Sequence, residues 1–253
     1  MSAGSLCVPA RAQVSRPGIV ASLPGEVRAM ARLRAQGRAS LTGGARLALS
    51  GLGAARAETA ARALVADGVD GLVSWGCASA LVPALAVGDL LLPREIVTAA
   101  GPRLAVDAEW HARLTDRIGG GARLRHGALA ETRGVLGNAA NKQALHALST
   151  AIAADRESAA IAAVAVEFGL PFIVVRAVAD DAVMTVPPVA RAALDDDGAL
   201  RPLRVLRRLV RPPAGRHAEL RAIKQLAVAF RTAQRTLDAV APLLLDTEPD
   251  GDT

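Results

Sequence analysis

Residues 152–182 read IAADRESAAIAAVAVEFGLPFIVVRAVADDA. Ile152–Asp155 is short and apolar, which favours a strand, and Glu157–Phe168 is rich in Ala, which favours a buried helix that Gly169 closes. Pro171–Val178 is a continuous apolar run with several Val residues, typical of a strand buried on both faces. The stretch therefore predicts a strand, a helix and a second strand.

The same alternation of strands and helices extends toward the N-terminus. The further predicted strands are Gly18–Leu23, Arg46–Ser50, Val69–Trp75, Asp89–Leu92, Glu95–Thr98 and Glu131–Leu136. The further predicted helices are Glu26–Gln36, Ala54–Ala66, Asp107–Ile118 and Lys142–Ala151. Strands that alternate with helices imply a mostly parallel sheet covered on both faces. We therefore expect an α/β protein: a three-layer α/β/α sandwich around a mixed, mostly parallel twisted sheet.

Composition excludes several classes of protein. The chain has 253 residues, of which 51% are hydrophobic, so it is not intrinsically disordered. With two Trp, three Phe and no Tyr, it lacks the aromatic platforms on which single-stranded nucleic acids stack. Cys7 and Cys77 cannot build a disulfide framework, and no hydrophobic leader precedes the first strand, so we expect a cytoplasmic protein. No Cys/His cluster has metal-ligand spacing, so no metal site is expected.

Glycines and polar side chains follow the predicted strands. The segments concerned are Ala21–Glu26, Ser50–Gly53, Ser74–Ser79, Ala154–Ser158 and Arg176–Asp181. Ligands of α/β sheets bind at the carboxyl ends of strands, and glycine lets backbone N–H groups approach a ligand closely. Gly51-Leu-Gly53 is not a dinucleotide fingerprint, because Arg56 stands where the third glycine would be. These segments are therefore the candidate site.

Residues 18–182 resemble the nucleoside phosphorylase/nucleosidase family. The most specific match is the helix start Asp155–Ala162 followed by a strand that ends Arg-Ala-x-x-Asp at Arg176–Asp180. Ser50–Gly53 and Leu85–Leu90 are supporting matches. The nearest pattern is that of 5′-methylthioadenosine/S-adenosylhomocysteine nucleosidases. The resemblance implies a phosphorylase/hydrolase-like fold and an enzyme that breaks the N-glycosidic bond of a purine nucleoside without a cofactor.

Three carboxyl groups would carry the chemistry that this resemblance implies. Asp180 matches the acid that protonates the leaving purine, which requires a raised pKa. Glu157 matches the residue that accepts hydrogen bonds from the ribose hydroxyls and stabilises the positively charged ring. Glu26 matches the residue that orients or activates the nucleophile. Arg176, inside an apolar strand, is expected to hold a structural ion pair.

The resemblance also indicates where the ligands would bind. The expected substrate-binding residues are Glu157, Arg156, Phe172, Cys77, Ala78 and Ser79. The expected phosphate or nucleophile site is formed by Gly51, Gly53, Cys77 and Arg28. Inorganic phosphate is the expected co-substrate. However, Ser74 stands where hexameric purine phosphorylases place an Arg for phosphate, so hydrolysis stays open, and Arg156 replaces the usual Met.

The remaining segments complete the predicted organisation. We expect a flexible leader over residues 1–16, a catalytic core over 17–185, and a basic helical extension over 186–253 packed on the same domain. The extension resembles that of hopanoid-associated phosphorylases, which implies phosphorolysis of adenosylhopane with release of adenine in hopanoid biosynthesis. Two alternatives stay open: a hydrolytic methylthioadenosine/S-adenosylhomocysteine nucleosidase, and a catalytically degenerate nucleoside-binding protein.

The charge of the extension suggests one further partner. Between Arg191 and Arg235 there are eleven Arg/Lys against four acids, and Leu200–Val210 interleaves apolar and basic residues at helical spacing. Such a segment suits an anionic membrane surface, so docking through residues 200–235 at the inner face of the membrane is a hypothesis. A solvated helix face is the alternative. No motif for specific nucleic-acid binding is present, and a homo-oligomer stays open.

Overall fold

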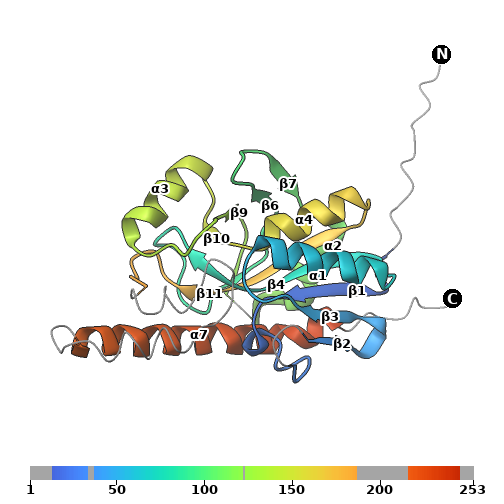
Figure 1. Ribbon diagram of the computed structural model, residues 1–253, viewed down its shortest axis with the longest axis horizontal. Helices are drawn as coiled ribbons and strands as arrows, with labels where there is room; N and C mark the ends of the chain where they lie inside the picture. Colours follow the sequence, from blue (N-terminus) through green and yellow to red (C-terminus); the bar gives the residue numbers. More distant parts are fainter. Residues whose placement is uncertain (1–12, 34–36, 122, 187–215, 246–253) are drawn as a thin grey trace, which may run out of the picture.

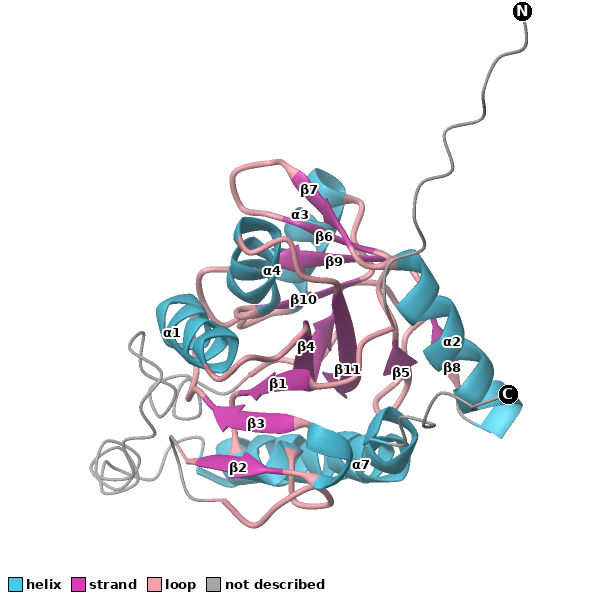
Figure 2. Cartoon of the chain, turned by 90° about the vertical axis from the view of Figure 1, so that its right-hand side faces the viewer, coloured by secondary structure: helices cyan, strands magenta, loops and turns pink. Residues whose placement is uncertain are grey.

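The chain folds into three layers. The computed structural model describes residues 13–33, 37–121, 123–186 and 216–245. The helices are α1 (Ala54–Ala66), α2 (Ala108–Ile118), α3 (Ala139–Ser149), α4 (Ser158–Glu167) and α7 (Arg216–Leu245). The strands are β1 (Pro17–Ala21), β2 (Arg38–Ser40), β3 (Arg46–Leu49), β4 (Gly71–Ala80), β5 (Leu90–Leu91), β6 (Glu95–Val97), β7 (Arg103–Ala105), β8 (Leu124–Arg125), β9 (Ala128–Glu131), β10 (Ala153–Asp155) and β11 (Phe172–Asp180). Figures 1 and 2 show the sheet between α1 and α4 on one side and α7 on the other, which confirms the predicted fold class.

The sheet is mixed and mostly parallel. Its main order is β2-β3-β1-β4-β10-β9-β6-β7, and β11 lies beside β4 and continues the sheet through β5 to β8. Six of the ten strand pairings described are parallel. The longest parallel pairing joins β11 to β4, and every residue of β11 is buried. Because both faces of this central pair are covered by helices, its sequence is mostly apolar and does not alternate between apolar and polar residues.

A separate hydrophobic core fills each face of the sheet. On one face, Leu64 of α1 and Ile161 of α4 pack with the strands. On the other face, Leu114 of α2 and Leu237 of α7 pack with the opposite sides of the same strands. Many of the buried helix positions are Ala, which lets the helix backbones approach the sheet and one another closely. The scarcity of aromatic residues is thus met by close packing of small and branched side chains.

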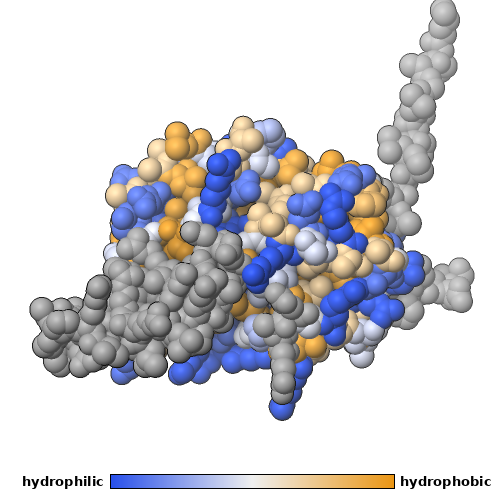
Figure 3. All heavy atoms as spheres, viewed as in Figure 1, coloured by the Kyte–Doolittle hydropathy of each residue, from blue (hydrophilic) through white to orange (hydrophobic). Residues whose placement is uncertain are grey.

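Helix α7 packs on the same sheet as the other helices. Leu237 is fully buried, and the Thr236 hydroxyl donates to the carbonyl of Gly88 over 2.8 Å. Figure 3 shows hydrophilic residues along the edge where α7 lies in Figure 1. Within the described residues, no helix is long and apolar enough to cross a membrane. The amphipathic segment Leu200–Val210 lies outside the described residues.

Two predicted elements were wrong. The expected helix Glu26–Gln36 begins as the single 3-10 turn η1 (Pro24–Glu26), because the Glu26 carboxylate folds back onto the N–H groups of Ser22 and Leu23. The expected strand Glu131–Leu136 is instead the last residue of β9 followed by a turn. Val14, which falls within the predicted leader, is buried in the core.

The role of α7 in the fold can be tested by shortening one of its buried side chains. We expect Leu237→Ala to lower the free energy of unfolding by about 2–5 kcal/mol, because a large apolar side chain is removed and a cavity remains. Urea unfolding measures the effect. Val228→Ala, on the exposed face of the same helix, is the matched control and should change stability by less than about 0.5 kcal/mol. Equal effects of the two variants would show that α7 does not pack as described.

Candidate functional site

Three buried carboxyl groups gather at the carboxyl ends of strands. Glu26 follows β1 in the turn η1, Glu157 lies between β10 and α4, and Asp180 ends β11. Glu26, Glu157 and Asp180 are 5%, 7% and 6% exposed. Carboxyl groups are rarely buried unless a function or a specific partner keeps them there. The contacts of each group therefore decide what it can do.

Backbone N–H groups hold the carboxylate of Glu26. Its Oε2 accepts from Ser22 N over 3.1 Å and Leu23 N over 2.9 Å, and its Oε1 accepts from Cys77 N over 2.9 Å. The indole of Trp75 donates to the Glu26 carbonyl over 2.7 Å and fixes the turn. Burial raises the pKa of Glu26, and the charge of Arg176 and these N–H groups oppose the rise. The result is a fixed carboxylate that can accept a proton.

Gly76 lets Glu26 approach the centre of the sheet. Its φ of +151° is a conformation that side chains other than hydrogen rarely allow. A Cβ at this position would lie 2.8 Å from Glu26 Oε1 and 3.0 Å from Arg176 Nη1. The carboxylate and the guanidinium therefore flank the same glycine. A side chain here would push both charged groups away from β4.

Arg176 connects β4, β10 and β11 by its side-chain bonds. Its Nε donates to Asp155 Oδ2 over 2.6 Å, and its Nη2 donates to Ser74 Oγ over 2.7 Å and Ser158 Oγ over 3.1 Å. Both charged side chains of the ion pair are 2% exposed. The structural ion pair expected for Arg176 is thus confirmed. The Ser74 hydroxyl therefore already has hydrogen-bond partners within the protein, namely Arg176 and Ser158.

Glu157 lies beside this ion pair and contacts the loop between β3 and α1. Its Oε1 accepts from Gly53 N over 2.7 Å. Burial and the negative charge of Asp155 raise the pKa of Glu157 to about 7, while Arg176 and the Gly53 N–H lower it. Such a carboxyl group changes its protonation near neutral pH. When ionised, it places a negative charge where a cation can be stabilised.

Asp180 pairs with a lysine that the sequence analysis did not identify. Its Oδ1 accepts from Ser79 Oγ over 2.8 Å, and its Oδ2 forms an ion pair with the ammonium of Lys142 from α3. Burial raises the pKa of Asp180, and Lys142 lowers it through charge and hydrogen bonding. Lys142 is completely buried. The available signal was composition, because only Lys142 and Lys224 are lysines in a chain rich in Arg.

One residue predicted for the ligand sites lies elsewhere, and another is paired within the protein. Phe172 begins β11 whereas Asp180 ends it, and a nine-residue strand spans about 26–30 Å, so the ring cannot line the same pocket. Its side chain is 4% exposed and belongs to a hydrophobic core. Arg28 Nε donates to Asp238 Oδ2 of α7 over 2.7 Å. The expectation that Phe172 contacts the substrate is therefore corrected, whereas the phosphate role of Arg28 stays a prediction.

The remaining predicted residues surround the carboxyl groups. Gly51 and Gly53 form the loop before α1, with φ of +79° and +100°. The N–H groups of Gly53 and Cys77 already donate to Glu157 and Glu26. Ala78 pairs with Val178 in the central strand pair. Burial raises the pKa of the Cys77 thiol, so this cysteine stays protonated and is not set up as a nucleophile.

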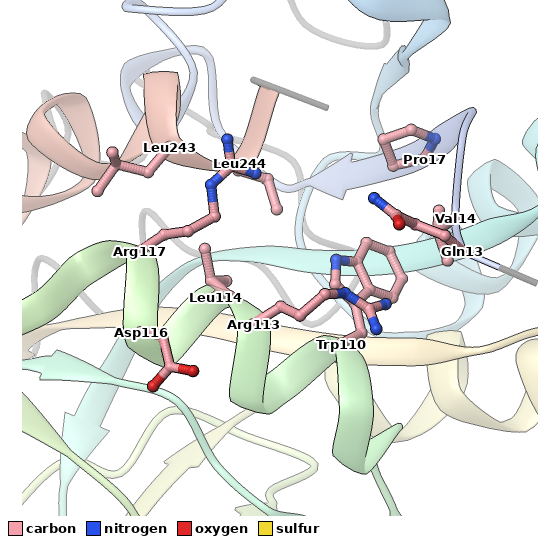
Figure 4. Close-up of a pocket in the computed structure, with 10 residues that line it drawn as sticks. All are labelled: Gln13, Val14, Pro17, Trp110, Arg113, Leu114, Asp116, Arg117, Leu243 and Leu244. Atoms are coloured by element: carbon pink, nitrogen blue, oxygen red, sulfur yellow. The ribbon is translucent and has the colours of Figure 1, made fainter. Parts of the chain in front are cut away.

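Two cavities differ in whether they adjoin the buried carboxyl groups. One of about 430 Å³ opens beside Gly53 and is lined by Arg56, Arg133 and Arg156. The other, of about 300 Å³, lies between α2 and α7, where Figure 4 shows Trp110 and Leu244 among its lining residues. Only the first adjoins the loop that contacts Glu157. Within the part of the chain described, no group of His, Cys, Asp or Glu is arranged to hold a metal ion.

The pKa of Glu157 predicts a pH-dependent stability. Its folded-state pKa of about 7 lies above the ordinary value of 4.5, so the folded protein binds this proton more tightly than the unfolded chain. The stability that the proton contributes is fully present below about pH 4.5 and is lost as pH rises toward about 7. In urea titrations, we expect the free energy of unfolding to fall more over this window in the wild type than in Glu157→Gln.

The exposed residue Glu109 on α2 provides the control for this experiment. Glu109→Gln removes the same carboxyl group from a side chain that is 64% exposed. Its pH dependence should follow the wild type, whereas that of Glu157→Gln should be flatter. Equal slopes for all three proteins would contradict the raised pKa of Glu157.

Several solved structures share the fold of this chain. Futalosine hydrolase of Helicobacter pylori strain 26695 superposes with a TM-score of 0.68 at 16% identity, over 92% of this chain and 98% of that chain. A 5′-methylthioadenosine/S-adenosylhomocysteine nucleosidase from Neisseria meningitidis, in complex with methylthio-immucillin-A, superposes with a TM-score of 0.67 at 18% identity, over 92% and 99%. The corresponding nucleosidase from Colwellia psychrerythraea 34H, in complex with adenine, gives 0.65 at 15% identity, over 92% and 95%. These likenesses show a shared fold.

The family is shown by the sequence itself. A search of curated proteins finds no match. The model of the phosphorylase superfamily, in contrast, matches residues 18–211, which include all three carboxyl groups and most of the chain. The match confirms the resemblance inferred from the segments around Glu157 and Asp180, and with it the expectation of an enzyme. The chain belongs to the phosphorylase superfamily.

Proposed function

We propose that this protein cleaves the N-glycosidic bond of an adenine nucleoside. The observation that carries the proposal is the gathering of Glu26, Glu157 and Asp180 as buried carboxyl groups with three different sets of partners. Breaking the C–N bond builds positive charge on the ribose and negative charge on the leaving base. A carboxylate suits the first charge and a proton donor suits the second.

Each group has a role that its contacts support. Glu157, when ionised, accepts hydrogen bonds from the ribose hydroxyls and stabilises the positively charged ring. Asp180, whose pKa burial raises, passes a proton to the base. Glu26 is fixed by three N–H groups and takes the proton of the nucleophile as the nucleophile attacks the ribose carbon. Pairs of titratable groups in different environments are the usual basis for such a division of acid and base roles.

The contacts favour water over phosphate as the nucleophile. The N–H groups of Gly53 and Cys77, expected to bind phosphate, already donate to carboxylates, and Arg28 pairs with Asp238. A buried carboxylate near the attacking group also repels an anion and activates a neutral water. Phosphorolysis, which the resemblance to hopanoid-associated phosphorylases implies, is the alternative for the same site.

For the substrate, we propose adenosylhopane as the first candidate and methylthioadenosine or S-adenosylhomocysteine as the second. The first rests on the resemblance of the basic extension to that of hopanoid-associated phosphorylases. The second is supported by the hydrolytic arrangement around Glu26 and by the fold shared with a nucleosidase that holds methylthio-immucillin-A. A peripheral position at an anionic membrane would bring the protein to a lipid-linked nucleoside.

The acid role of Asp180 can be separated from substrate binding by the choice of leaving group. Asp180→Asn should lower kcat on an adenine nucleoside by about 100-fold or more, the usual size of acid catalysis. On 4-nitrophenyl β-D-ribofuranoside, whose nitrophenolate leaves without a proton, the same variant should stay close to the wild type. Glu157→Gln should be impaired on both substrates, because both form a positively charged ribose. A near-wild-type rate of Asp180→Asn on the nucleoside would exclude this role.

Substrate and nucleophile are decided by one assay of adenine release. Adenosylhopane, methylthioadenosine and S-adenosylhomocysteine are compared at equal concentration, each with and without inorganic phosphate. We expect the fastest release from adenosylhopane and a rate that does not depend on phosphate. A phosphate-dependent rate with a ribosyl phosphate product would establish phosphorolysis. No adenine from any of the three would contradict the proposed function.

A further inference from the structure

Lys142 of α3 is a buried cation that contacts the end of the buried strand β11. Its side chain is fully buried, and its ammonium contacts Asp180 Oδ2 and the carbonyl oxygen of Asp181. The other lysine of the chain, Lys224 on α7, is exposed. Burying an ammonium has a large desolvation cost, so its partners must offset that cost. Here the offset comes from a carboxylate that is itself buried.

The chemistry of this cation differs from that of the neighbouring one. Of the 30 basic residues, 28 are Arg, and the buried cation that organises the centre of the sheet is Arg176. A guanidinium is not deprotonated in proteins, so it acts as a permanent charge. An ammonium gives up a proton far more readily when it is buried. Unlike the guanidinium of Arg176, an ammonium is a chemical group that can transfer a proton as well as carry a charge.

We propose that Lys142 is a positioning residue that holds the proton which Asp180 delivers to the leaving base. This inference rests on the proposed nucleoside cleavage. The pair has two forms, ammonium with carboxylate and amine with carboxylic acid, and they differ by the position of one proton between Lys142 Nζ and Asp180 Oδ2. With the site empty the ionic form is the stable one, because the two charges attract each other at close range.

Departure of the base moves the proton. As the C–N bond breaks, its electron pair stays with the base, whose ring nitrogen becomes basic. One proton then passes from Lys142 Nζ to Asp180, and Asp180 gives a proton to the base, which leaves neutral. Glu26 takes one proton from the attacking water, and the remaining hydroxyl forms the new bond to the ribose carbon. Exchange with solvent removes the proton from Glu26 and returns one to Lys142, so charge and atoms balance.

The other groups that face Asp180 do not replace this function. Ser79 from β4 donates a hydrogen bond to Asp180 Oδ1, which supports a carboxylate but adds no charge. Asp181, the next residue, raises the pKa of Asp180 by its negative charge. Burial raises the pKa of the Cys77 thiol on β4, and the negative charge of Asp180 raises it further, so this thiol stays protonated. Among these neighbours, Lys142 alone carries a positive charge that can balance the negative charge of Asp180.

Three variants test the proposal. Lys142→Met removes the charge with similar volume, Lys142→Arg keeps a charge that cannot be transferred, and Lys224→Met makes the same change at the exposed lysine. We expect Lys142→Met and Lys142→Arg to lower kcat on an adenine nucleoside by about 100-fold or more and to change KM little. On 4-nitrophenyl β-D-ribofuranoside both should stay within about threefold of the wild type, because that leaving group needs no proton. Lys224→Met should equal the wild type on both substrates.

The outcomes separate this inference from simpler explanations. A Lys142→Arg rate equal to that of the wild type would overturn it, since the charge alone would then suffice. Equal losses on both substrates would show that Lys142 only maintains the structure. If Lys142→Met does not fold, Lys142→Ala assayed with added ethylamine or guanidinium gives the same comparison. We expect ethylamine, but not guanidinium, to restore the rate of Lys142→Ala on the nucleoside. Restoration by both compounds or by neither overturns the proposal. A wild type inactive on both substrates would instead remove the proposed function.

Discussion

The buried guanidinium of Arg176 is the constraint on which the rest of the site depends. It neutralises Asp155 through a direct ion pair and lowers the pKa of Glu26 and Glu157 by its charge. Without Arg176, the carboxyl groups of Asp155, Glu26 and Glu157 would lie in a protein interior of low dielectric with no cation beside them. Their mutual repulsion would favour protonation or unfolding. Its hydrogen bonds to Ser74 and Ser158 also tie β4 and α4 to β11.

Around this fixed charge, each functional carboxyl group has a different environment. Glu26 is held by backbone N–H groups, which favour its ionised form and fix its direction. Glu157 has one N–H donor and a negative neighbour, so its pKa rises to about 7. Asp180 forms an ion pair with the buried ammonium of Lys142. The three roles proposed for these carboxyl groups rest on this difference between their environments.

The sequence pattern predicted the layers and the ends of the strands, but it did not place Phe172 or the turn at Glu26 correctly. The central strands were predicted because burial on both faces leaves continuous apolar runs. Phe172 was misplaced, although its position at the start of β11 already put it at the opposite end of the strand from Asp180. The turn at Glu26 was read as a helix, because the return of its carboxylate onto Ser22 N is not visible in local periodicity.

By itself, the sequence determined the class of fold, the family, and which carboxyl groups stand at strand ends, since each depends on residues close together in the chain. Only the tertiary structure decided their partners. The contacts of Asp180 with Lys142 and Ser79, and of Glu157 with Gly53, join residues 38, 101 and 104 positions apart. Strand order and register bring such residues together, including the antiparallel pairing of β10 with β4. Local periodicity fixes neither, because the same alternation of apolar residues is compatible with several orders of strands.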